Sequence, residues 1–140
     1  MKTYLIYTDG GASGNPGPAG VGVVICDEKK KILNKISEYI GNATNNQAEY
    51  KAVIRALYEL SKIKENEPTQ YRFFLDSELV VHQLNLKYKV KHPELQPLFL
   101  NVHNAAISLG NVSFTHIRRE ENQAADKLVK MAIKEAKNGK

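Results

Sequence analysis

The spacing of hydrophobic residues changes several times along the chain, and each change marks a predicted element. β-Branched and aromatic side chains fill residues 3–8, and residues 9–11, an aspartate followed by two glycines, predict a turn that ends this strand. Two further apolar runs, 19–27 and 31–41, flank three polar residues, which is typical of a β-hairpin. The N-terminal part of the chain is therefore predicted to form three successive strands.

From Thr44 onward the apolar residues recur with helical spacing, three and four positions apart. This pattern predicts a helix that continues to about Ile63 and has Thr44 or Asn45 as its N-cap. A polar break follows, and residues 71–75 predict a fourth strand that ends at Asp76. Helix and strand thus alternate from this point on.

The remaining sequence predicts three more helices and one more strand. A short helix over residues 77–85 and a longer one over 93–110 come first, followed by a strand over 111–117. The last helix is predicted to begin near Glu121 or Asn122. The order β-β-β-α-β-α-α-β-α is typical of an α/β fold in which helices pack on a mixed sheet.

Composition narrows the class of protein. The chain has 140 residues, of which 42% are hydrophobic and 25% charged, and it contains no repeat or linker, so we expect a single domain over residues 1–140. The lone cysteine, Cys26, lies in an apolar run, so there is no disulfide framework. No apolar run reaches the roughly 18 residues of a membrane span. We therefore expect a cytoplasmic monomer without a membrane segment.

The formal net charge is +5, which permits an acidic partner such as nucleic acid but does not require one. Four lysines recur on one side of the last predicted helix, opposite its apolar stripe, and this pattern predicts an ordinary solvated face rather than a nucleic-acid contact. These lysines are Lys127, Lys130, Lys134 and Lys137.

Four carboxylates stand at positions where packing alone does not require an acid. Asp9 and Asp76 end apolar strands, at the edge where α/β sheets usually place their sites. Glu49 shares the apolar face of its helix, where an unpaired buried charge is costly, and Asp126 lies at the edge of the apolar stripe of the last helix. Each acid alone has a structural interpretation as a turn or helix N-terminal residue stabilised by the helix dipole. Their joint occurrence instead predicts one metal-binding cluster.

Hard divalent cations with oxygen ligands would neutralise such a cluster directly. Magnesium is the expected ion, and manganese is the alternative. Two such ions about 4 Å apart can activate a water molecule and stabilise the leaving oxygen in phosphodiester hydrolysis. A P-loop or dinucleotide-binding loop is the competing interpretation of the glycine-rich residues 10–20. We set it aside because no Gly-Lys-Ser/Thr follows and the loop leads into a strand.

Four segments together resemble the successive motifs of the type 1 ribonuclease H family, which cleaves the RNA strand of RNA–DNA hybrids. They are YTDGGASGNPGPAG, TNNQAEYKAVIRAL, LDSELVV and ENQAADKLVKMA, and each contains one of the four acids. The resemblance covers nearly the whole chain. It implies a ribonuclease H-like fold, with a five-stranded mixed sheet and helices on both faces, and a magnesium-dependent endonuclease with a two-metal mechanism. It also implies that the metal-binding and catalytic acids are Asp9, Glu49, Asp76 and Asp126.

The resemblance further implies a substrate groove beside these acids. Glycines would let the nucleic-acid backbone approach the main chain, and amides would hydrogen-bond riboses and bases, with Thr44 and Asn15 holding a DNA phosphate. Plain turn and cap roles are the alternative, above all for Asn45. The implied groove residues are Gly10, Gly11, Asn15, Thr44, Asn45, Asn46 and Gln47.

Two departures from the family pattern bear on function. The basic helical handle that many members carry after the fourth strand is absent from this sequence, which makes it a short member. The stretch before Asp126 has no room for the family's mobile histidine loop. Arg118 or Arg119 is therefore predicted to stabilise charge there, with Arg118 the favoured catalytic residue, and His116 is expected to lie in the strand. Two alternatives stay open: the same chemistry with broader substrates including double-stranded RNA, and a noncatalytic hybrid-binding module.

Overall fold

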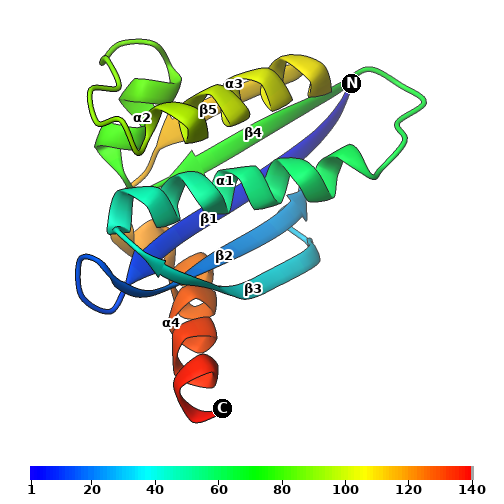
Figure 1. Ribbon diagram of the computed structural model, residues 1–140. Coiled ribbons are helices and arrows are strands. Elements are labelled where there is room, and N and C mark those ends of the chain that lie inside the picture. Colours follow the sequence, from blue (N-terminus) through cyan, green and yellow to red (C-terminus); the bar gives the residue numbers. More distant parts are fainter. Residues whose placement is uncertain (140) are drawn as a thin grey trace.

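The computed structural model describes residues 1–139, which form a five-stranded sheet flanked by helices (Figure 1). The strands are β1 (Lys2–Ala12), β2 (Gly17–Asp27), β3 (Ile32–Ala43), β4 (Thr69–Leu75) and β5 (Asn111–His116). The helices are α1 (Asn45–Ser61), α2 (Glu78–Leu84), α3 (Gln96–Leu109) and α4 (Gln123–Asn138), with the short 3-10 helix η1 (Arg119–Glu121) before α4. Within residues 1–139, no helix combines the length and the apolar character that a bilayer crossing needs.

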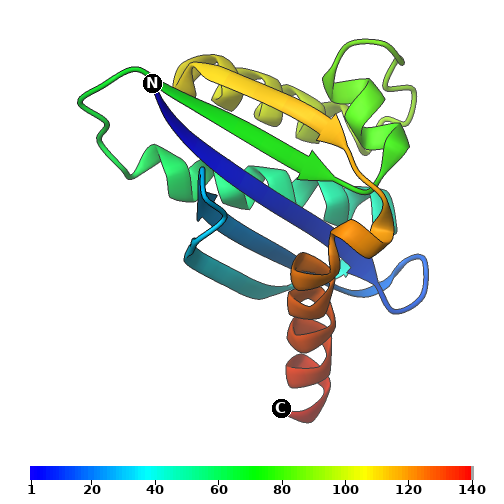
Figure 2. The ribbon, with the colours of Figure 1, turned by 180° about the vertical axis from the view of Figure 1, so that it is seen from behind.

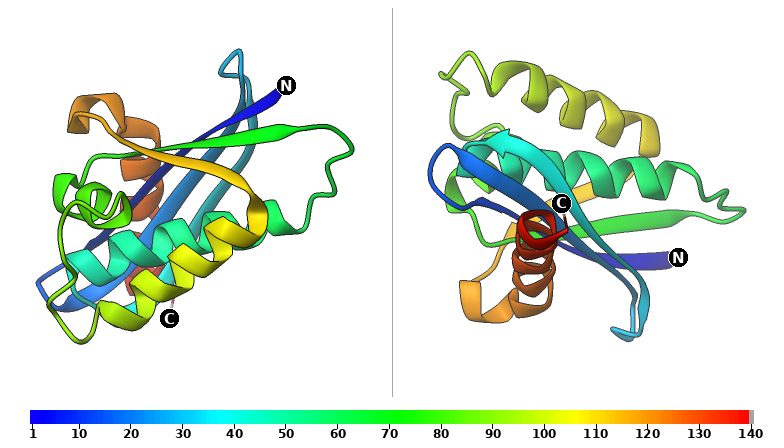
Figure 3. Two further views of the ribbon diagram at one scale, coloured as in Figure 1. Left: turned by 90° about the horizontal axis from the view of Figure 1, so that it is seen from above. Right: turned by 60° about the horizontal axis from the view of Figure 1, so that its bottom comes forward.

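The sheet is mixed, with the strand order β3-β2-β1-β4-β5. β1 pairs antiparallel with β2, and β2 with β3, whereas β4 runs parallel to both β1 and β5. Figure 2 shows α4 on the face turned away from α1, and the two views of Figure 3 show α3 running along α1. The predicted α/β architecture, a mixed sheet with helices on both faces, is confirmed.

The first strand is longer than the sequence predicted, because the glycines after Asp9 belong to the strand and not to a turn. β1 continues to Ala12, and β2 pairs with it along this whole stretch. The prediction that Asp9 ends the strand was therefore wrong. The last pair shared by β1 and β4 is Tyr7 with Phe74, so Asp9 lies just beyond the end of β4 while its own strand goes on.

Two glycines let helices approach the sheet closely at this level. A Cβ atom on Gly10 would lie 2.1 Å from the carbonyl oxygen of Ala48 in α1, and one on Gly22 would lie 2.2 Å from that of Ala125 in α4. Both separations are far inside van der Waals contact, so only glycine fits at either position. Gly22 is the β2 partner of Asp9. The two helices therefore pack closely against the two faces of the sheet next to Asp9.

The start of α3 differs from the predicted one, and the start of α4 agrees with it. α3 begins at Gln96 rather than near Pro93, with Pro97 in its first turn, where a missing backbone N–H is tolerated. α4 begins at Gln123 with Asn122 at its N-cap position, which agrees with the predicted start.

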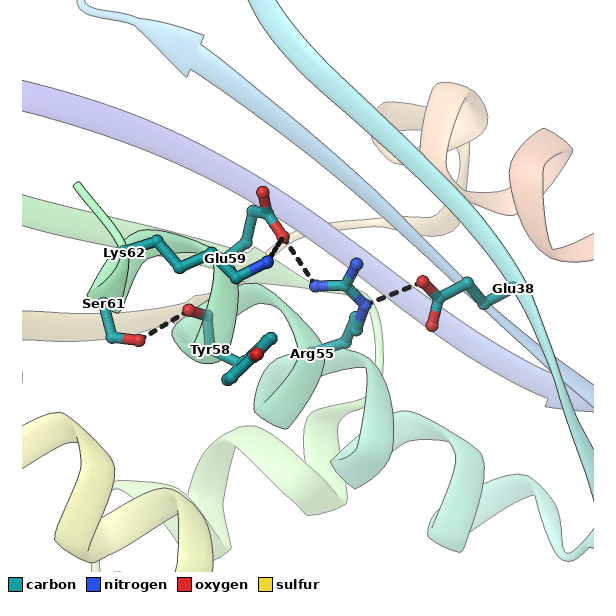
Figure 4. Close-up of polar contacts among 6 residues, drawn as sticks. All are labelled: Glu38, Arg55, Tyr58, Glu59, Ser61 and Lys62. Atoms are coloured by element: carbon teal, nitrogen blue, oxygen red, sulfur yellow. Dashed lines mark hydrogen bonds and ion pairs between the residues drawn. The ribbon is translucent and has the colours of Figure 1, made fainter.

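Helix α1 is capped at its N-terminus and tied to β3 in its C-terminal half. At its N-terminus Thr44 forms a capping box with the residue three positions later. Nearer its C-terminus, Arg55 lies between two carboxylates (Figure 4), with Nε 2.9 Å from Glu38 Oε2 in β3 and Nη1 2.8 Å from Glu59 Oε1. These contacts, together with its apolar face packed on β1, fix the helix that carries Glu49.

Candidate metal centre

Three carboxylates from separate elements meet at one end of the sheet. Asp9 comes from β1, Glu49 from the N-terminal half of α1, and Asp76 directly follows β4. The parallel pairing of β1 and β4 explains why Asp9 and Asp76 lie close together. Because Tyr7 lies opposite Phe74, the two acids lie at the same level of the sheet. One oxygen from each of the three carboxylates lies within 4.8 Å of the other two.

Asp126 stands beside this cluster. It lies in the first turn of α4, and its negative charge is one of the causes that raise the pKa of Asp9. Its side chain is 30% exposed, and its Oδ2 forms an ion pair with Lys130 Nζ at 3.0 Å. The fourth acid is therefore close enough to Asp9 to act on its charge, but it is more exposed than Asp9 and Glu49 and already has a cationic partner.

Burial and crowding of like charges shift the titration of the buried acids. The pKa of Asp9 is raised to about 7, first by burial and then by the charges of Asp76 and Asp126. The pKa of Glu49 is also raised well above its usual value, again first by burial and then by Asp9 and Asp76. Without a cation, the cluster therefore holds protons at a pH where carboxyl groups are normally ionised.

The donor set fits a hard divalent cation. All the converging atoms are carboxylate oxygens, which Mg²⁺ and Mn²⁺ prefer. Glu49 Oε1 is buried and has no hydrogen-bond partner within residues 1–139. In the same part of the chain, no basic side chain forms an ion pair with Asp9, Glu49 or Asp76. A bound cation would thus neutralise charges that the described residues leave uncompensated.

Asn122 is a site residue that sequence reasoning missed. Its side chain is fully buried, and its Nδ2 donates to the backbone oxygen of Thr8 and to Asp76 Oδ2, both at 2.9 Å. One amide thereby connects the N-terminus of α4 with the strand β1 and with the carboxylate that follows β4. The sequence signalled Asn122 only as a helix start, although its side chain caps nothing.

The predicted groove residues gather where the loop after β1 meets the start of α1. Asn45 Oδ1 accepts from the N–H of Ala12 at 2.9 Å, and Asn15 Oδ1 accepts from the N–H of Asn45 at 3.0 Å. The packing of α1 already explains why Gly10 is a glycine, whereas a Cβ on Gly11 would meet nothing closer than 3.6 Å. Loop and helix are therefore locked together beside the acids.

The capping box occupies two more of the predicted groove residues. The N–H of Thr44 donates to Gln47 Oε1 at 2.9 Å, and the N–H of Gln47 donates to Thr44 Oγ1 at 3.1 Å. Within residues 1–139 the half-buried side chain of Asn46 forms no hydrogen bond, so its amide is free for a ligand. Contact of any of these residues with a substrate stays a prediction.

Of the two residues predicted near the missing histidine loop, His116 lies in β5, as expected, and Arg118 follows the end of that strand. His116 is the last residue of β5, opposite Leu75. Arg118 has 73% of its side chain exposed, and its Nε lies 3.7 Å from Glu120 and 3.6 Å from Glu121. These partners hold the guanidinium at the surface, and the catalytic role of Arg118 stays a prediction.

We expect the metal-free protein to lose stability as the pH rises from about 4 to about 7. In the unfolded chain Asp9 and Glu49 titrate near 4, whereas in the folded protein the pKa of Asp9 is about 7 and that of Glu49 is also raised. The folded state therefore binds more protons in this window. The stabilisation is complete below the unfolded pKa and is lost as the pH passes the folded pKa.

Urea unfolding in EDTA should show a fall in the free energy of unfolding on the order of 2–4 kcal/mol between pH 4.5 and pH 8. The variant Glu49→Gln removes one of the two titrating groups and should show a shallower fall. A fall of equal size in both proteins would contradict this origin of the pH dependence.

Comparison with known proteins identifies relatives over almost the whole chain. A family model described as reverse transcriptase-like matches residues 7–132. A ribonuclease H from Caldicellulosiruptor saccharolyticus is 33% identical over 158 residues, covering 96% of this chain and 99% of its own length. A ribonuclease HI from Halobacterium salinarum is 35% identical over 130 residues, covering 93% and 64%. A bifunctional protein of Mycobacterium tuberculosis is 36% identical over 92% of this chain, which spans only 35% of that longer protein.

Solved structures give the same picture in three dimensions. LC11-RNase H1, isolated from compost by a metagenomic approach, matches with a TM-score of 0.93 and 48% identity over 97% of this chain and 99% of its own. A second structure shows LC11-RNase H1 in complex with an RNA/DNA hybrid, with a TM-score of 0.89 and 47% identity over 95% and 98%. The RNase H1 of Halobacterium salinarum also matches, with a TM-score of 0.89 and 33% identity over 95% and 98%.

Proposed function

Because the chain belongs to the type 1 ribonuclease H family, we propose that it hydrolyses the RNA strand of RNA–DNA hybrids at the carboxylate cluster. The observation that carries this proposal is the convergence of oxygens from Asp9, Glu49 and Asp76 within 4.8 Å. The complex of LC11-RNase H1 with an RNA/DNA hybrid supports the choice of substrate, since that protein is 47% identical to this chain.

We assign Mg²⁺ to this cluster, with Mn²⁺ as the alternative. The residues that would hold two ions are Asp9, Glu49, Asp76 and Asp126. When bound, such ions lower the pKa of a water molecule and stabilise negative charge on the phosphate. The acids therefore act as ligands, and the proposal does not require any of them to donate a proton.

The chain's own residues would position the metal ions and the RNA strand and would distinguish RNA from DNA. Asn122 donates to Asp76 Oδ2 and so fixes the orientation of that carboxylate. The burial of Asp9 and Glu49 strengthens their attraction for a cation, because less water screens their charge. The neighbouring groove would align the RNA strand with the cluster, and a hydrogen bond to a ribose 2′-OH would distinguish RNA from DNA.

Cleavage of matched substrates tests the proposal. A labelled RNA–DNA hybrid, an RNA duplex and a DNA duplex of one sequence are incubated with the protein, with Mg²⁺ and with EDTA. We expect cleavage of the RNA strand in the hybrid, with Mg²⁺ only. Equal cleavage of the RNA duplex would establish the broader substrate range, and hybrid binding without cleavage would establish a noncatalytic module.

The free amide of Asn46 gives a sharper test of the groove. We expect Asn46→Ala to weaken hybrid binding by about 1–2 kcal/mol through lost hydrogen bonds, with metal affinity unchanged. The measurement is the Kd of a fluorescent hybrid, with Asn66→Ala as the control because Asn66 is exposed in the segment between α1 and β4. Equal affinity in both variants would remove Asn46 from the groove.

A further inference from the structure

A row of lysines on α4 borders a shallow hollow next to the candidate metal centre. The row consists of Lys127, Lys130, Lys134 and Lys137, spaced three or four positions apart so that they share one side of the helix. The last three of them line a hollow of about 460 Å³ together with Ala12, Ser13, Ile133 and Asn138. No carboxylate of residues 1–139 lines this hollow.

The ammonium groups at this hollow are poorly neutralised. Lys130 pairs with Asp126 at 3.0 Å, whereas Lys137 Nζ donates to the neutral hydroxyl of Ser13 at 3.0 Å. Neither Lys134 nor Lys137 forms an ion pair with any acid in residues 1–139. Positive charges that surround one concavity without a counter-charge repel one another, and an anion placed there relieves that repulsion.

Side-chain contacts link the hollow to the candidate site at both of its ends. At one end Lys130 touches Asp126, the acid beside the carboxylate cluster. At the other end Lys137 touches Ser13, in the loop that also carries Asn15. Seven residues of helix span about 10 Å, which matches the rise of about three nucleotides along one strand.

We propose that Lys134 and Lys137, with Ser13, bind backbone phosphates of the RNA–DNA hybrid outside the cleaved bond. This inference rests on the proposed function and extends the substrate surface from the acids along α4. The sequence alone favoured a solvated face for these lysines. The structure shows the four lysines of the row exposed and adds that three of them line one hollow without a carboxylate from the described part of the chain, next to Asp126.

The test compares two double variants with equal loss of charge. Lys134→Ala/Lys137→Ala removes the proposed phosphate contacts. Lys29→Ala/Lys31→Ala removes two exposed lysines from the turn between β2 and β3, at the other end of those strands from the loop that carries Ser13. Hybrid cleavage gives kcat and KM, and the Kd of a fluorescent hybrid is measured with Asp76→Asn added to every protein so that the substrate stays intact.

For the α4 variant we expect KM and Kd to rise about ten-fold with kcat unchanged, and the slope of log Kd against log salt to fall by about 1–2, as expected for two lost phosphate contacts. The turn variant should match the unmutated protein. If both variants give the same Kd and the same salt slope, the inference is overturned. If the unmutated protein neither binds nor cleaves the hybrid, the proposed function itself has failed.

Discussion

Replacing Asp76 by asparagine is expected to reduce hybrid hydrolysis about a hundred- to a thousand-fold, the scale on which loss of one electrostatic group acts in an active site. Asparagine keeps the shape and one ligand oxygen but removes the negative charge. The same charge raises the pKa of both Asp9 and Glu49, so its loss also relieves repulsion in the metal-free fold. We therefore expect the metal-free variant to be more stable by an amount on the order of 1 kcal/mol.

Melting curves with and without Mg²⁺ separate these two effects. Added Mg²⁺ should stabilise the unmutated protein more than the variant, because only the state that binds the ion gains from mass action. Asp27→Asn is the control, since Asp27 accepts hydrogen bonds within the turn after β2, and this change should leave hydrolysis intact. If Asp76→Asn melts lower without metal or cleaves at the unmutated rate, Asp76 is a structural turn residue.

Gly10→Ala is expected to destabilise the protein by about 3 kcal/mol or more, because the added methyl group would overlap the backbone of α1. The nearest atom, the carbonyl oxygen of Ala48, would lie 2.1 Å from the new Cβ, and it belongs to the main chain, which cannot rotate away. To relieve the overlap, α1 must move off the sheet and carry Glu49 with it. Urea unfolding at fixed pH, with an unchanged m-value, measures the loss.

Gly11→Ala provides the matched control for this prediction. The nearest atom to its new Cβ, in Val129, would lie 3.6 Å away, which is ordinary contact, so stability should change by less than about 1 kcal/mol. If the nucleic-acid backbone approaches this stretch of β1, Gly11→Ala should still raise the KM for the hybrid. Equal destabilisation by both substitutions would contradict the close packing of α1 on Gly10.

Much of the fold could be predicted from the spacing of apolar residues. The acids of the site could be predicted because they occupy positions where that spacing calls for apolar residues or where a strand ends. Glu49 was recognisable because a charge on an apolar helix face needs compensation, and Asp76 because it follows a strand. The extension of β1 beyond Asp9 was not predictable in this way. Glycines usually indicate a turn, and only the approach of two helices, a tertiary contact, explains Gly10 within a strand.

At the site, the side-chain contacts of Asn122 and Arg118 could not be predicted from the sequence either. An asparagine at the start of a helix has a sufficient local explanation, so nothing in the sequence revealed that its amide reaches Thr8 and Asp76. For Arg118 the sequence showed a cation near the acids but not its ion pair with Glu121. Side-chain partners across elements depend on geometry that a linear pattern does not contain.

The close packing of α1 and α4 on the sheet beside Asp9 has a consequence for hydrogen exchange. β1 is the central strand, paired with β2 over residues 4–12 and with β4 over residues 2–7, and it is covered by α1 on one face and α4 on the other. Its amide protons should therefore exchange with solvent deuterium only through global unfolding, whereas the short peripheral helix α2 can open by itself. A cluster anchored on this strand has no locally unfolded form, so its acids assemble and disperse together with the whole domain.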